Sequence, residues 1–83
     1  MSDNRGNMIK SKNTPKYQAL LKWLKIQRIE QGMTIRELGI LVDEPFQFVS
    51  KVEKGQRKLG VDEYIKYCQA LGVDYLIGLK LLE

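Results

Sequence analysis

The sequence has no histidine and only one cysteine, and both shortages exclude classes of site. Without histidine, the commonest metal ligand and general base is missing from the 83 residues. Cys68 has no partner for an internal disulfide, and it lies on the apolar face of an expected helix, where a thiol is a small buried hydrophobe rather than a nucleophile. No phosphate-binding loop, metal cluster or nucleophile beside a base is visible. The sequence therefore predicts no enzyme and no cofactor.

Long apolar runs are also absent. No segment approaches the roughly 18 apolar residues of a membrane span. The N-terminal stretch MSDNRGNMIKSKN lacks the apolar core of a signal peptide. Together with the lack of a disulfide framework, these features predict a cytoplasmic protein that does not enter a membrane. Hydrophobic residues make up 43% of the chain, which suits one small domain.

Positive charge is concentrated in two parts of a chain whose net charge is +4. Residues 1–16 carry four basic residues and one acid, and residues 45–60 carry the same balance. Residues 17–44 are neutral overall, whereas residues 61–83 are acidic. Such clustering suits a polyanionic partner, but a solvated surface explains the charge alone equally well.

Apolar spacing and helix-cap signals predict an all-α fold of five short helices without a sheet. Residues 1–13 are polar and aperiodic, so they are expected to form a flexible basic arm before a folded domain of residues 14–83. The expected helices run from Pro15 to about Gln31, from Ile35 to about Val42, from Pro45 to Lys54, from Val61 to Leu71 and from Tyr75 to about Leu82.

The third expected helix has a buried face and an outward face. At about 100° per residue, Val49 and Val52 point toward the core, with Phe48 beside them and Phe46 between the two faces. The outward face is polar and basic, and it carries Gln47, Ser50, Lys51 and Lys54. A turn of about three residues separates this helix from the preceding one, as in a helix-turn-helix whose second helix enters a major groove.

Three segments, in their order and spacing, resemble the phage repressor and Cro helix-turn-helix family. They are RIEQGMTIREL at 28–38, FVSKVEKG at 48–55 and ALGVD at 70–74. The resemblance covers roughly residues 17–78 and implies a compact five-helix, lambda-repressor-like domain. It further implies a transcriptional regulator of bacterial or phage genes, expected to act as a repressor that binds double-stranded DNA as a homodimer.

The resemblance also implies roles for individual residues. Base contacts would come from the recognition helix, through Phe46, Gln47, Ser50 and Lys51. Gln47 can pair with adenine and Lys51 with the O6 and N7 atoms of guanine. Phosphate contacts would come from the start of the second helix and from the loop after the third, through Thr34, Ile35, Gln56, Arg57 and Lys58.

One expected ion pair is structural. The apolar stripe of the first helix continues to Arg28, and a charge at a buried position needs a partner. Glu53 lies at the rim of the core face of the third helix, and the family has an arginine–glutamate bridge at these two positions. We therefore expect Arg28 and Glu53 to pair.

Five positions depart from the family pattern. Ile35 stands where glutamine is common, Gly39 where alanine is common, and Asp43 replaces a turn glycine. Glu44 would be repelled by a phosphate, and Phe46 cannot hydrogen-bond a base edge. These departures leave an alternative open, a protein-interaction module that keeps the fold and binds a protein partner through Phe46 and its neighbours.

The last helix has more apolar residues than one core face requires. Our preferred interpretation is that it covers Trp23 and Ile26 of the first helix, while part of its surface forms a homodimer contact. A sequence-specific DNA-binding regulator is the leading hypothesis, and the protein-interaction module is the alternative.

Overall fold

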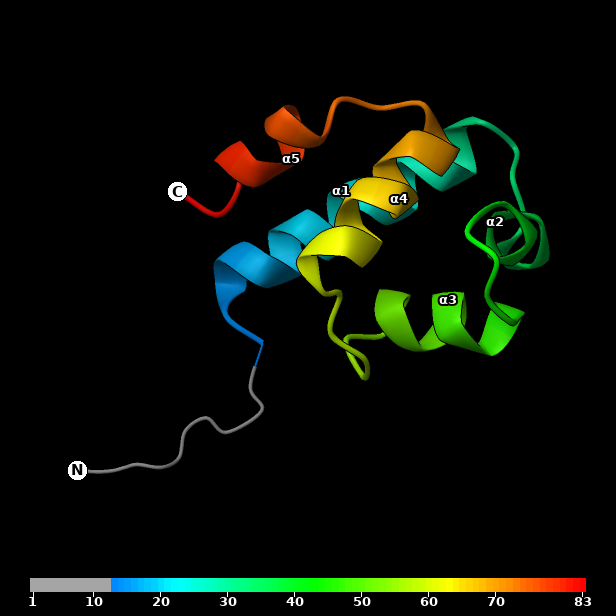
Figure 1. The fold of residues 1–83 in the computed structure, drawn as a ribbon. Helices are drawn as coiled ribbons and strands as arrows, with labels where there is room; N and C mark the ends of the chain where they lie inside the picture. The colour runs from blue at the N-terminus through cyan, green and yellow to red at the C-terminus, as the bar shows by residue number, and fades with distance from the viewer. Residues whose placement is uncertain (1–12) are drawn as a thin grey trace.

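The computed structural model describes residues 13–83, and within that range it is helical with no strand (Figure 1). The helices are α1 (Pro15–Glu30), α2 (Ile35–Leu41), α3 (Phe46–Glu53), α4 (Val61–Leu71) and α5 (Tyr75–Lys80). The predicted all-α, five-helix fold is confirmed. Pro45 is the N-cap of α3 rather than its first residue, and α5 ends earlier than expected. Residues 1–12 of the expected arm lie outside the described range.

Local hydrogen bonds explain where the helices begin. The Thr14 hydroxyl accepts the backbone N–H of Tyr17 at 3.1 Å, and Pro15 follows at the first helical position, where its missing N–H has no intrahelical partner. The Asp74 carboxylate accepts the backbone N–H of Leu76 at 2.9 Å and begins α5. These side-chain caps satisfy donors that a helix start leaves unpaired.

The turn between α2 and α3 brings these helices very close together. Asp43 has a φ of 60°, a left-handed conformation that aspartate tolerates better than most residues. At Gly39, an added Cβ atom would lie 2.8 Å from the Glu44 carbonyl oxygen and 3.3 Å from the Phe46 nitrogen. Glycine therefore sets the separation of the two helices.

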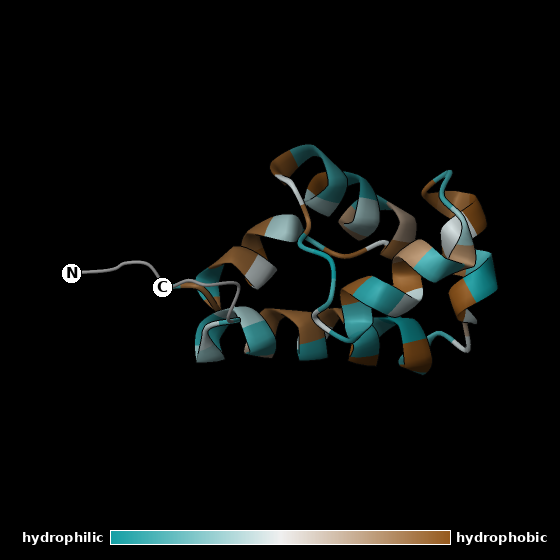
Figure 2. Ribbon diagram, turned by 90° about the horizontal axis from the view of Figure 1, so that it is seen from below, coloured by the Kyte–Doolittle hydropathy of each residue, from teal (hydrophilic) through white to brown (hydrophobic). Residues whose placement is uncertain are grey.

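The core lies between α1, α2, α3 and α4. Its most deeply buried side chains are Leu24, Leu38, Val49, Val52, Tyr67, Cys68 and Leu71. The predicted burial of Cys68 is confirmed, and desolvation raises the pKa of its thiol. Each helix shows both apolar and polar segments when the ribbon is coloured by hydropathy (Figure 2).

Helix α5 packs across α1 and α4 through Gly78. An added Cβ atom there would lie 2.7 Å from the Trp23 ring and would overlap the Tyr64 hydroxyl. The Tyr64 hydroxyl donates to the Tyr75 carbonyl at 2.6 Å, which joins α4 to the start of α5. The expected cover over Trp23 is present, but Ile26 remains 39% exposed, so the expectation for Ile26 was wrong.

Among residues 13–83, no helix has both the length and the hydropathy needed to cross a bilayer.

Candidate nucleic-acid interface

Helix α3 lies at the lower edge of the molecule in Figure 1, with α1 and α4 between it and α5. Val49 and Val52 are fully buried and Phe48 is nearly so, which confirms the core-facing side predicted for this helix. Gln47 and Lys51 are exposed, and Ser50 is half-buried. The helix therefore presents polar groups outward from a rigid, packed backing.

Phe46, the first residue of α3, is half-buried beneath a cation. The guanidinium carbon of Arg36 lies 4.0 Å from the centroid of the Phe46 ring. Arg36 belongs to α2 and is exposed. Sequence reasoning missed this contact. The only available signal was that both residues flank a tight turn between two helices expected to touch.

The loop after α3, residues 54–60, is held by an ion pair. Both terminal nitrogens of Arg57 donate to the Glu63 carboxylate at 2.8 Å, and one also donates to the Lys58 carbonyl at 2.7 Å. The hydrogen bonds to Glu63 raise the pKa of Arg57. Hydrogen bonds from Arg57, and then from the Gly60 backbone N–H, lower the pKa of Glu63 to about 2.

Further contacts tie the same loop to α1 and to the residue that precedes its N-cap. The Leu59 backbone N–H donates to the Tyr17 hydroxyl at 3.2 Å, and the Asn13 amide donates to the Gly55 carbonyl at 3.0 Å. The Lys58 ammonium lies 4.7 Å from the Tyr17 ring centroid, within range of a cation–π interaction. Gln56 and Lys58 are exposed, so the loop presents polar side chains from an ordered backbone.

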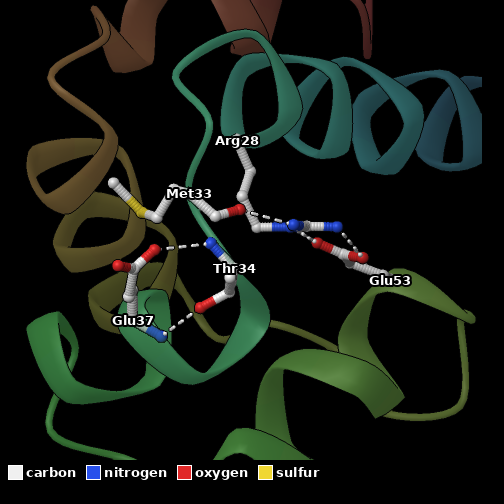
Figure 3. A network of polar contacts seen from close by, with 5 residues as sticks. All are labelled: Arg28, Met33, Thr34, Glu37 and Glu53. Carbon is white, nitrogen blue, oxygen red and sulfur yellow. Dashed lines mark hydrogen bonds and ion pairs between the residues drawn. The ribbon is translucent and has the colours of Figure 1, made fainter.

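The start of α2 is closed by a reciprocal cap (Figure 3). The Glu37 carboxylate accepts the Thr34 backbone N–H at 2.8 Å, and the Thr34 hydroxyl accepts the Glu37 backbone N–H at 3.0 Å. The Ile35 side chain packs against the core. At these two expected phosphate positions, the side chains are thus directed to the cap and to the core.

The expected pair of Arg28 and Glu53 forms in the structure. The Nε and Nη2 atoms of Arg28 lie 2.6 and 3.1 Å from the two Glu53 carboxylate oxygens, and Nη1 donates to the Met33 carbonyl at 2.6 Å (Figure 3). The two charged side chains are only 12% and 9% exposed. The network joins α1, α3 and the segment that leads into α2.

A family model described as helix-turn-helix matches residues 24–76. The chain belongs to the helix-turn-helix family. This family is one of DNA-binding transcription regulators, and the match runs from the middle of α1 into the start of α5. The resemblance drawn from the sequence is therefore confirmed at the level of this helix-turn-helix family.

Two solved structures illustrate what this helix-turn-helix protein is similar to. An XRE-family like protein from Pseudomonas syringae pv. tomato str. DC3000 is 40% identical and has a TM-score of 0.75, and the alignment covers 80% of this chain and 82% of that chain. The clp gene regulator ClgR from C. glutamicum is 25% identical with a TM-score of 0.73, covering 83% of this chain and 90% of that chain. A search of curated proteins found no match.

Proposed function

We propose that this helix-turn-helix protein is a transcriptional repressor of the phage repressor and Cro type, with α3 in the major groove of a specific DNA site. The observation that carries the proposal is the exposed polar face of α3, which stands on fully buried Val49 and Val52. A helix backed in this way keeps its side chains in fixed positions relative to the base edges.

The base contacts come from the outward residues of α3. The Gln47 amide can donate to N7 of adenine and accept from its N6 amino group. Lys51 can donate to the O6 and N7 atoms of guanine. Ser50 lies beside them and can serve either base. Phe46 contributes the uncovered part of its ring, which suits contact with a thymine methyl group.

Phosphate contacts come from either side of α3. On one side, exposed Gln56 and Lys58 belong to the ordered loop, where the charge of Arg57 is already matched by Glu63. On the other side, the start of α2 contributes through the backbone N–H of Ile35, because the Ile35 side chain packs against the core and the N–H and hydroxyl of Thr34 are both bonded to Glu37.

Selection from a random duplex library at near-physiological salt tests this function. We expect an enriched two-fold-symmetric motif, and we expect Lys51→Ala to lose discrimination at one guanine by about 1–3 kcal/mol. Lys66→Ala is the matched control because it removes the same charge from an exposed position on α4, which belongs neither to α3 nor to the surface proposed below for the dimer. Enrichment that is absent for the wild type, or equal for both variants, would contradict the proposal.

Homodimer formation is proposed through the outer surface of α5 and the end of α1. Leu76 and Ile77 are 55% and 53% exposed, and Ile29 of α1 is 55% exposed. The Gln31 side chain donates to the Leu71 carbonyl at 2.6 Å, which places the end of α1 beside the connection from α4 to α5. These residues supply apolar area for a second copy.

Sedimentation equilibrium tests the dimer. Ile77→Glu is expected to yield monomers, because it places a charge in the proposed apolar contact. Ile40→Glu on α2 introduces the same charge at a position that is 78% exposed but outside that surface, so it should leave association unchanged. A monomeric wild type, or equal association of both variants, would refute this interface.

A protein-interaction module remains the second candidate, and one observation favours it. Ile40 and Leu41 are exposed on α2, and with Met33 they line a shallow hollow. Phe46 is less suited to this role than expected, because Arg36 covers its ring. Protein binding that depends on Ile40, is insensitive to salt and is unaffected by Lys51→Ala would favour this candidate.

A further inference from the structure

The contact between Arg36 and Phe46 joins the two helices of the helix-turn-helix at their exposed edge. Arg36 is the only basic residue of α2, whose sequence is IRELGIL. Phe46 is the first residue of α3, and its ring centroid lies 4.0 Å from the Arg36 guanidinium carbon. A planar guanidinium stacks on an aromatic face in a defined orientation, which a lysine ammonium does not.

The donor groups of Arg36 are available. Among residues 13–83, its guanidinium makes no hydrogen bond and no ion pair, and the side chain is exposed. The adjacent acid Glu37 uses its carboxylate to accept the Thr34 backbone N–H. Arg57 differs in this respect, because Glu63 already occupies its two terminal nitrogens.

The backbone that carries the Phe46 ring is held close to α2. Gly39 holds α2 against the start of α3, since a Cβ atom there would lie only 3.3 Å from both the nitrogen and the Cα atom of Phe46. The ring is therefore attached to a backbone segment that cannot easily move relative to α2. An otherwise flexible arginine gains a preferred position from this arrangement.

We propose that Arg36 donates to a backbone phosphate of bound duplex DNA, and that Phe46 is a positioning residue that holds the guanidinium for this contact. The proposal rests on the function proposed above. When a helix-turn-helix docks, the first helix crosses the DNA backbone while the start of the second meets base edges. A cation that belongs to α2 and lies over the first residue of α3 is placed at that boundary. Arginine offers a fork of donors that suits phosphate oxygens.

Binding of a duplex with the selected motif, measured by fluorescence anisotropy over a range of salt concentrations, tests the proposal. The logarithm of the binding constant falls linearly with the logarithm of the salt concentration, and removing one phosphate contact reduces the steepness of this slope by about 0.9 per protomer. We expect this decrease for Arg36→Ala, with the same base preferences as the wild type. Lys66→Ala, the matched control, should keep the wild-type slope. Melting temperatures of all variants establish that they are folded.

Two further variants separate the role of the ring from that of the charge. Phe46→Leu keeps an apolar side chain that can touch a thymine methyl group, but it removes the stacking surface. It should lower the salt slope toward that of Arg36→Ala, and the double variant should fall no further. Arg36→Lys should have a slope between those of Arg36→Ala and the wild type, because lysine keeps the charge but does not stack on the Phe46 ring.

The possible failures are distinguishable. If the wild type selects no motif, the proposed function fails. If the wild type selects a motif and Arg36→Ala has the slope of Lys66→Ala, DNA reading stands and the Arg36 contact is refuted. If Phe46→Leu instead changes one base preference at constant slope, Phe46 reads a base and does not position Arg36. A change in base preference caused by Arg36→Ala would likewise overturn the assignment to phosphate.

Discussion

Replacing Glu53 by alanine would leave Arg28 with a charge that its surroundings cannot match. The Arg28 side chain is 12% exposed, so water replaces the carboxylate poorly, and only the bond to the Met33 carbonyl at 2.6 Å remains. Breaking a buried ion pair from one side costs about 3–5 kcal/mol. We expect about 3 kcal/mol for Glu53→Ala, near the lower end of that range, because of the retained bond.

Urea unfolding followed by circular dichroism measures the loss of unfolding free energy. A thermal melt gives a second readout: at about 4–8 °C per kcal/mol for a domain of this size, the melting temperature should fall by roughly 12–24 °C. Glu30→Ala is the matched control, since Glu30 is an exposed acid on α1, and its effect should stay within about 0.5 kcal/mol. The slope of free energy against urea should be unchanged if the compactness of both states is preserved.

A double replacement distinguishes an orphaned charge from simple loss of an attraction. Arg28→Met combined with Glu53→Leu removes both charges and keeps apolar volume, so it should be much less destabilising than Glu53→Ala. If the single variant melts like the wild type, or the double variant is as unstable as the single, the reasoning fails.

Three further predictions concern other parts of the fold. The pKa of Glu63 is lowered to about 2 in the folded protein from a usual value of 4.5, so its pairing stabilises the fold above about pH 4.5 and this stabilisation is lost as the pH falls toward 2. Urea unfolding should therefore show the wild type to be more stable than Glu63→Gln at about pH 6 but not at about pH 2. An equal difference in unfolding free energy at both pH values would contradict this. Gly39→Ala should destabilise by about 1–3 kcal/mol despite a better helix propensity, because the new Cβ meets the Glu44 carbonyl; a higher melting temperature would be the opposite result. Cys68 should react with a thiol reagent only in denaturant, since it has no exposed surface, and rapid labelling in native buffer would disprove its burial.

Features that arise from one helix could be predicted from the sequence. The start of α1 followed from Thr14 and Pro15, because a cap uses residues only a few positions apart. The buried and outward faces of α3 followed from 3.6-residue periodicity, which placed Val49 and Lys51 on different sides. The Arg28–Glu53 pair needed two facts, a charge within an apolar stripe and the family resemblance, because spacing alone does not select a partner on another helix.

The contacts of the remaining cations depend on distances between elements, which the sequence did not specify. Arg57 was assigned to DNA phosphate on the basis of its charge and its loop, yet Glu63 occupies its terminal nitrogens in the free protein. Arg36 received no role, although the close approach at Gly39 brings its guanidinium over Phe46. A basic residue with an acid nearby in the sequence can form an ion pair with that acid or remain available to a polyanion. The distance between the two side chains in the fold determines which of these occurs. The cations that face DNA in our proposal therefore differ from those predicted from the sequence. Arg36 is added, and the charge of Arg57 is already matched by Glu63.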